Sequence, residues 1–144
     1  HVIASHGNER VSTAMAAQVG LGVAELLAKD KTPEQREQLA TEGQVRLWWD
    51  GTPLDVFLDT TAFHREVAGR IRWEQFGDVT LPFLSCRDLA VFKAFFDRTK
   101  DWADLEEMQA AGTLDATGVA GVLVEYLGGA DPRIERLRRL AGWA

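Results

Sequence analysis

The sequence has little cysteine, little positive charge and no long hydrophobic run. Its single cysteine, Cys86, excludes an internal disulfide and is typical of a reducing compartment, so we expect a cytoplasmic protein. The net charge of -6 argues against a broadly basic platform for nucleic acids, although it leaves room for a local basic patch. Because there is no run of about 18 apolar residues and no signal-peptide pattern, we expect no membrane span and no membrane partner.

Several common motifs for nucleotide binding and catalysis are also missing. The glycines of VGLG, at 19–22, lack the spacing and the lysine of a phosphate-binding P-loop. No G-x-S-x-G elbow occurs, and Cys86 has no evident base. His6 and His64 have no Cys, His or Glu partner at metal-ligand spacing, so we interpret both as polar loop or helix-end residues.

The first half of the chain predicts strands joined by tight turns. Two apolar runs flank Asp50-Gly51, a pair that tolerates positive φ, which predicts a hairpin. A second hairpin is expected from strands at 70–76 and 79–84, and a weaker strand at 10–19. The 144 residues fit one structural domain of ordinary globular composition.

Helix start signals dominate the second half. Ser85 and the pair Asp131-Pro132 predict N-termini there, as Thr32 followed by Pro33 does earlier in the chain. Further helices are expected at 101–111 and 115–127, and the expected core-facing stripe of the helix after Ser85 consists of Leu89, Phe92, Phe95 and Phe96. We therefore predict an α/β or α+β fold in which a mixed sheet with flanking helices, residues 1–84, is followed by a helical C-terminal portion, residues 85–144.

An acidic residue interrupts the second strand of the first hairpin. Asp55 alternates with the aliphatic residues Leu54, Val56 and Leu58, and Asp59 lies on the same side as Asp55. A carboxylate within an apolar strand costs desolvation free energy unless a cation or hydrogen-bond donors meet it. Asp55 therefore either lines a cleft or binds a metal such as Mg²⁺, whereas Asp59 is equally well explained as a strand end and cap.

A second charged group follows Ser85. Lys93, Asp97, Asp101 (or Lys100) and Asp104 recur at steps of three and four residues, which predicts a mixed-charge stripe on one face of neighbouring helices. A solvated ion-pair surface explains this spacing without any function. Lys93 differs from the others because it lies among apolar residues, where a lysine is often positioned for an anion such as phosphate.

Three segments together resemble a known family. They are LDVFLDTTAFH, LPFLSCRDLAVFKAFFDRTKDWADLEEM and GGADPRIERL, and they are similar to the minimal bacterial nucleotidyltransferases of the DNA polymerase β-like superfamily, including the toxin–antitoxin type. In that superfamily an Asp-x-Asp pair and a third carboxylate hold two divalent metals, which stabilise the attacking and leaving oxygens during nucleotidyl transfer. The resemblance implies Mg²⁺ and a nucleoside triphosphate as cofactors.

The resemblance also implies roles for individual residues. It places Asp55 at the third metal-binding carboxylate and Lys93, with Asp101 or Asp104, among further active-site residues. Upstream, ASHGNERVSTAMA resembles the segment that leads into Asp-x-Asp, so Ala14 and Ala16 occupy the two Asp positions, and Arg10 and Thr13 join Lys93 as nucleotide-binding residues. Loss of two metal-binding carboxylates implies an inactive form, either engineered or a natural pseudoenzyme.

The resemblance and the residues suggest three alternative functions. The first is a nucleotidyltransferase of a toxin–antitoxin system that modifies RNA or protein and is inactive in this form, with a cognate antitoxin or a second copy of the chain as partner. The second is a pseudo-nucleotidyltransferase that acts as a binding module or antitoxin. The third is a transferase that adds a nucleotide to a small molecule of the aminoglycoside type, for which an acidic pocket is expected.

Overall fold

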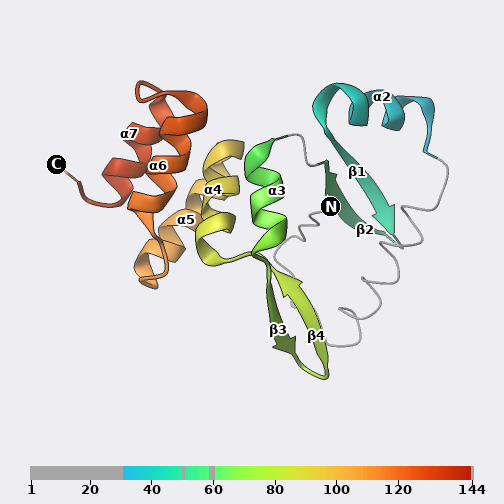
Figure 1. The fold of residues 1–144 in the computed structure, drawn as a ribbon, viewed down its shortest axis with the longest axis horizontal. Coiled ribbons are helices and arrows are strands. Elements are labelled where there is room, and N and C mark those ends of the chain that lie inside the picture. Colours follow the sequence, from blue (N-terminus) through green and yellow to red (C-terminus); the bar gives the residue numbers. More distant parts are fainter. Residues whose placement is uncertain (1–30, 50, 59–60, 144) are drawn as a thin grey trace. The chain divides into compact units, whose positions relative to one another are not determined.

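A computed structural model of the chain describes residues 31–49, 51–58 and 61–143 (Figure 1). Within these ranges the chain forms six helices and two antiparallel sheets, so the α+β class expected from the sequence is confirmed. In chain order the elements are α2 (Pro33–Glu42), β1 (Gln44–Trp49), β2 (Thr52–Phe57), α3 (Ala62–Gly69), β3 (Arg72–Phe76), β4 (Val79–Phe83), α4 (Cys86–Phe96), α5 (Thr99–Ala110), α6 (Ala116–Leu127) and α7 (Pro132–Leu140). None of the described helices is long and apolar enough to cross a membrane.

The chain divides into two compact units, His1–Phe83 and Leu84–Ala144. The division falls where the sequence changes from alternating strands and helices to helices alone. Each unit is described by itself below.

Helix α2 opens the described part of the first unit with a complete capping box. The Thr32 hydroxyl accepts a hydrogen bond from the backbone N–H of Gln35, whose side chain accepts one from the N–H of Thr32. Pro33 follows the cap at the first helical position, where a missing N–H costs nothing. The helix begins where Thr32 and Pro33 predict it, and none of its residues is buried.

Strands β1 and β2 form the predicted hairpin, closed by two residues that include Gly51 with a φ of 77°. Val45 faces Val56 across the strands and both are buried, while Arg46 faces Asp55 on the opposite surface. The strand ends at Phe57, but the next residue, Leu58, continues the register, because its backbone N–H donates to the carbonyl of Gly43. The expected aliphatic face is buried at Val56, whereas Leu58 is 41% exposed.

Strands β3 and β4 form the second predicted hairpin around Gly77, whose φ is 59°. Each sheet has a tryptophan opposite a proline, Trp48 with Pro53 and Trp73 with Pro82, and both indoles are exposed. The described strands thus form two separate hairpins, not the single mixed sheet that was expected, because each strand pairs with its neighbour in sequence through a two-residue turn. The further strand predicted at 10–19 lies outside the described residues.

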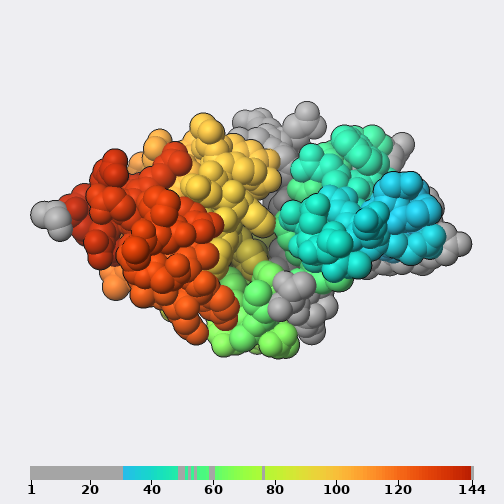
Figure 2. Space-filling view, turned by 90° about the horizontal axis from the view of Figure 1, so that it is seen from above, coloured from blue at the N-terminus to red at the C-terminus, as the bar shows by residue number. Residues whose placement is uncertain are grey.

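The second unit is a bundle of four helices. In the space-filling view, side chains of α6 and α7 (orange to red) lie directly against those of α4 (yellow), as the inter-helix contacts require (Figure 2). The core residues come from all four helices: Ala90, Val91, Phe92, Ala94, Trp102, Leu105, Ala116, Val119, Leu123, Ile134 and Leu137. At about 25 cal/mol for each Å² of apolar surface removed from water, this shared core supplies the main stabilisation of the unit.

The inward face of α4 differs in part from the predicted stripe. Phe92 is buried as expected, but Leu89 is 38% exposed and the wholly buried positions include Ala90 and Ala94. Small side chains allow the neighbouring helices to approach α4 closely, so the face of α4 that contains alanines turns inward and the bulkier Leu89 lies at its edge. Hydrophobic size was therefore the wrong guide at this position.

Candidate functional site

Lys93 lies near the end of α4 and forms an ion pair with Asp104 of α5. The lysine side chain is only 18% exposed, and that of Asp104 is 37% exposed. A largely buried ammonium group requires a partner, and the carboxylate on the neighbouring helix provides it. The sequence stripe therefore brings these two residues together across two helices, at one corner of the second unit.

Asp101 lies in the first turn of α5, beside this pair in sequence, and is almost completely buried. Its carboxylate receives two hydrogen bonds from the Arg98 guanidinium, of 2.6 and 3.1 Å, and its side chain is 3% exposed. Arg98 also lies over the Phe96 ring, 4.8 Å from its centroid. An acidic residue in the first turn interacts favourably with the helix dipole, so Asp101 stabilises the start of α5.

Asp97 joins α4 to α5 and has an unusual backbone conformation. Its φ is 55°, and in the described chain it is the one non-glycine residue with a positive φ. Its backbone N–H donates to the carbonyl of Lys93, and its carboxylate accepts a 2.6 Å hydrogen bond from the indole Nε1 of Trp102. Arg136 of α7 reaches the same carboxylate at 3.7 Å. Asp97 thereby fixes the corner between the two helices that carry Lys93 and Asp104.

The corner offers an anion site of limited size. An ammonium group has three donors, and Asp104 accepts from one of them, which leaves capacity for a phosphate oxygen at the exposed part of Lys93. The same geometry also stabilises the bundle without any ligand. Lys93 and Asp104 are thus paired as members of the predicted stripe, while Asp101, one helical turn earlier, pairs with Arg98.

Asp55, the predicted metal ligand, is held by an arginine on the opposite strand. Arg46 donates to both carboxylate oxygens of Asp55, at 2.7 and 2.9 Å. The hydrogen bonds and the charge of Asp55 raise the pKa of Arg46. The side chain of Asp55 is 21% exposed and that of Arg46 is 50% exposed. The cation that a mid-strand carboxylate needs is therefore supplied within the hairpin.

The donor set around Asp55 does not fit a resident divalent metal. Magnesium is bound through several oxygen ligands, whereas both carboxylate oxygens of Asp55 accept hydrogen bonds from a guanidinium group. Across residues 31–49, 51–58 and 61–143, no group of three or more His, Cys, Asp or Glu side chains is placed to hold an ion. The positions Arg10, Thr13, Ala14 and Ala16, together with Asp59, lie outside the described residues, and alanine has no metal-ligating side chain.

Comparison of the chain with models of protein families, with curated proteins and with solved structures gives no match. The similarity to nucleotidyltransferases stays a prediction from the sequence motifs.

Two contributors to these sites were missed in the sequence. Arg46 was not considered, although a two-residue turn at positions 50 and 51 places it directly across from Asp55. The hydrogen bond from Trp102 to Asp97 had no sequence signal, because an indole partner five residues away depends on how the helices meet.

Proposed function

We propose that this chain is a nucleotidyltransferase-like protein of the toxin–antitoxin type, inactive in this form. Its active counterpart transfers a nucleotide from a nucleoside triphosphate to an RNA or protein acceptor. The observation that carries the proposal is the partly buried pair of Lys93 and Asp104, whose residues are those that the sequence resemblance assigns to the active site. A lysine kept at 18% exposure and oriented by a carboxylate is arranged as phosphate-binding lysines require.

The corner residues have distinct tasks in this proposal. Lys93 binds an oxygen of the triphosphate, and Asp104 orients the ammonium group toward it. Asp101, held by Arg98, fixes the first turn of α5 and thereby the position of Asp104 one turn later. Prepositioned charge of this kind lowers the barrier for phosphoryl chemistry because the groups need no reorganisation during reaction.

The absence of activity follows from the two alanines. Ala14 and Ala16 stand at the positions of the Asp-x-Asp pair, so this chain lacks the carboxylates that hold divalent metal in the family it resembles. The bidentate contact between Arg46 and Asp55 favours a second candidate, a pseudoenzyme that binds nucleotide without transferring it. In that case both carboxylate oxygens of Asp55 are engaged by Arg46 instead of by a metal.

A label-transfer assay tests the proposal. The chain and its double revertant Ala14→Asp, Ala16→Asp are incubated with Mg²⁺, each of the four α-labelled nucleoside triphosphates, and RNA or protein acceptors. We expect the revertant to transfer label and the unchanged chain to transfer none. In the revertant, Lys93→Met lowers transfer about tenfold or more, the effect of losing one charge-assisted hydrogen bond. Lys100→Met, at an exposed position of α5, is the matched control and leaves transfer unchanged.

The outcomes separate the two candidates. Transfer that depends on Lys93 supports the enzyme, whereas triphosphate binding by both chains without transfer supports the pseudoenzyme. If neither chain binds or transfers any nucleotide, both candidates fail and the corner is a structural ion-pair cluster.

A further inference from the structure

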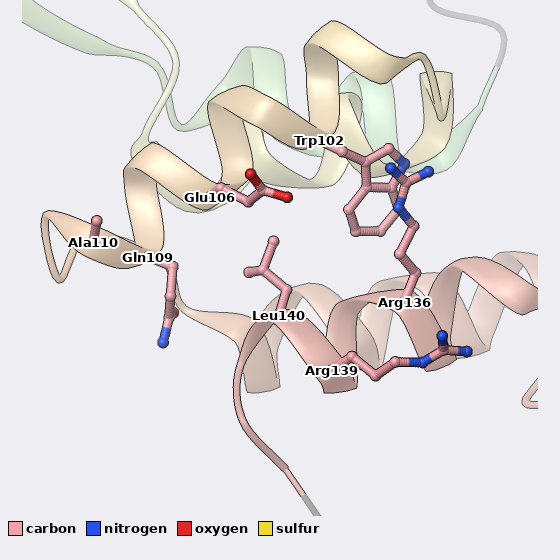
Figure 3. A pocket seen from close by; sticks show the side chains of 7 residues that line it. All are labelled: Trp102, Glu106, Gln109, Ala110, Arg136, Arg139 and Leu140. Atoms are coloured by element: carbon pink, nitrogen blue, oxygen red, sulfur yellow. The ribbon is translucent and has the colours of Figure 1, made fainter.

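A surface pocket of about 460 Å³ lies between α5 and α7, within the second unit (Figure 3). Its volume is in the range of small-molecule binding pockets, which measure roughly 300–1,000 Å³. The pocket is lined by Trp102, Glu106, Gln109, Ala110, Arg136, Arg139 and Leu140. It contains none of the residues assigned to the proposed nucleotidyltransferase site, so the inference below is independent of that function.

One wall comes from a single face of α7. Arg139 and Leu140 lie three and four residues after Arg136, which places all three on the same side of the helix. The buried residues Ile134 and Leu137 face the core instead. Two guanidinium groups and one aliphatic side chain therefore line the pocket from this helix.

The opposite wall comes from α5. Trp102, Glu106 and Gln109 again follow at steps of four and three residues. Asp101 and Asp104 lie one turn apart on a different face of this helix. In the close view, Glu106 points into the space between the helices, opposite Leu140 of α7 (Figure 3). This wall offers a carboxylate and a side-chain amide.

The arginines are placed for an anion. The Arg136 guanidinium lies over the Trp102 ring, 4.4 Å from its centroid, and 3.7 Å from a carboxylate oxygen of Asp97, yet half of the side chain is exposed. The stacking contact holds the planar group in place while its donors stay accessible. Arg139 is 76% exposed and bonds Glu135 through Nε at 3.3 Å. Figure 3 shows Arg136 reaching across to the Trp102 ring of α5, whereas the Arg139 side chain extends along α7.

We propose that this pocket binds a small phosphorylated ligand that carries an amino or amide donor, the chemistry of a nucleotide. Arginine forks match phosphate oxygens in a bidentate manner, so Arg136, which reaches across the pocket, binds the phosphate together with Arg139 from the exposed rim. The side chain of Glu106 forms no ion pair within the described part of the chain, and it accepts the donor group of the ligand. A carboxylate accepts two parallel N–H donors, which is the arrangement on one edge of a guanine base.

Binding of GMP to the full chain, without divalent metal, tests the proposal. Calorimetry or two-dimensional NMR titration gives the dissociation constant for GMP, guanosine and inorganic phosphate. We expect GMP to bind at least tenfold more tightly than either fragment, because only GMP engages both walls. No metal is added and only pocket residues and their control are varied, which separates this experiment from the label-transfer assay, in which Lys93 is varied.

Matched arginine variants locate the phosphate. Arg139→Gln weakens GMP binding about tenfold, whereas Arg138→Gln, an exposed arginine of α7 outside the pocket lining, leaves it unchanged. Arg136→Gln also removes the contact with Trp102, so the folding of this variant is checked by circular dichroism. If the variant is unfolded, the comparison of the Arg139 and Arg138 variants decides the assignment. Equal loss in the Arg138 and Arg139 variants means attraction by overall charge and overturns the assignment.

The Glu106→Gln variant tests the other wall. If Glu106 accepts the amino group of the ligand, the substitution weakens GMP binding and leaves phosphate binding unchanged. If the carboxylate only repels the phosphate, the substitution strengthens binding of both, which overturns the proposed ligand class. Failure of GMP to bind at millimolar concentration also overturns it.

Discussion

The left-handed conformation of Asp97 leads to a prediction that separates two energetic terms. Its carboxylate accepts the hydrogen bond of a buried indole, since Trp102 is 1% exposed and the Nε1 to Oδ1 distance is 2.6 Å. Its φ of 55° is unfavourable for most side chains but tolerated by glycine, asparagine and aspartate. Substitutions at this one position can therefore remove the acceptor, relieve the backbone strain, or do both.

The expected free energies follow from these two terms. Asp97→Ala leaves the indole N–H of Trp102 without its acceptor, which costs about 1–3 kcal/mol. The alanine side chain also costs about 1–2 kcal/mol for the left-handed conformation, so we expect a total loss of about 2–5 kcal/mol. Asp97→Gly removes the acceptor but fits the backbone, and should be about 1 kcal/mol less destabilising than alanine. Asp97→Asn keeps both an acceptor and the backbone tolerance, so its loss stays below about 1 kcal/mol.

Urea denaturation of the four proteins, followed by circular dichroism, measures these losses. The indole N–H resonance of Trp102 in a ¹H–¹⁵N spectrum provides a local check, because it shifts when the acceptor is removed. The predicted order is asparagine, then glycine, then alanine, from least to most destabilised. An alanine variant as stable as the glycine variant would refute the strain argument, and an asparagine variant as unstable as alanine would refute the hydrogen-bond argument.

Three further predictions concern other parts of the chain. In α6, Gly121→Ala raises the free energy of unfolding by about 0.5–1 kcal/mol. Gly118→Ala gives no such gain, because its Cβ would meet the carboxylate of Asp115, which caps the helix. Thermal denaturation of the two variants measures the difference. The pKa of Asp131 is lowered from 3.8 to about 2, chiefly by hydrogen bonds from Arg133. Its contribution to stability is therefore present above pH 4 and is lost as the pH falls toward 2. Asp131→Asn should remove this part of the acid denaturation profile. A double-mutant cycle of Arg46→Met and Asp55→Asn, measured on the free energy of unfolding, gives a coupling of about 0.2–1 kcal/mol that Mg²⁺ does not alter. Stabilisation by Mg²⁺ that requires Asp55 would contradict the structure.

The turns and helix starts of the described chain could be predicted because they depend on local chemistry. Thr32 and Ser85 cap helices as expected, and Gly51 and Gly77 adopt the positive φ that their two-residue turns require. Asp131 likewise caps α7 before its proline. Each of these features is decided within four or five residues, so no knowledge of the tertiary structure was needed.

The partners of charged residues were harder to predict. The spacing placed Lys93 and Asp104 in one stripe, but only the angle between α4 and α5 decides that they pair. Arg46 was overlooked although the hairpin register determines its position opposite Asp55, so the mid-strand carboxylate was attributed to a metal or a cleft alone. Leu89 was assigned to the core by its hydrophobicity, which does not report how closely neighbouring helices approach.

The prolines opposite the two exposed tryptophans affect how the hairpins meet other chains. A proline within a strand lies where its nitrogen is not needed by the partner strand, so Pro53 and Pro82 remove one donor each from the outer edges of β2 and β4. An extended segment that approached the outer edge of β2 or β4 would find one main-chain hydrogen bond missing near an end of a short strand. Each hairpin thus presents an exposed indole while its proline discourages strand addition at the edge formed by β2 or β4.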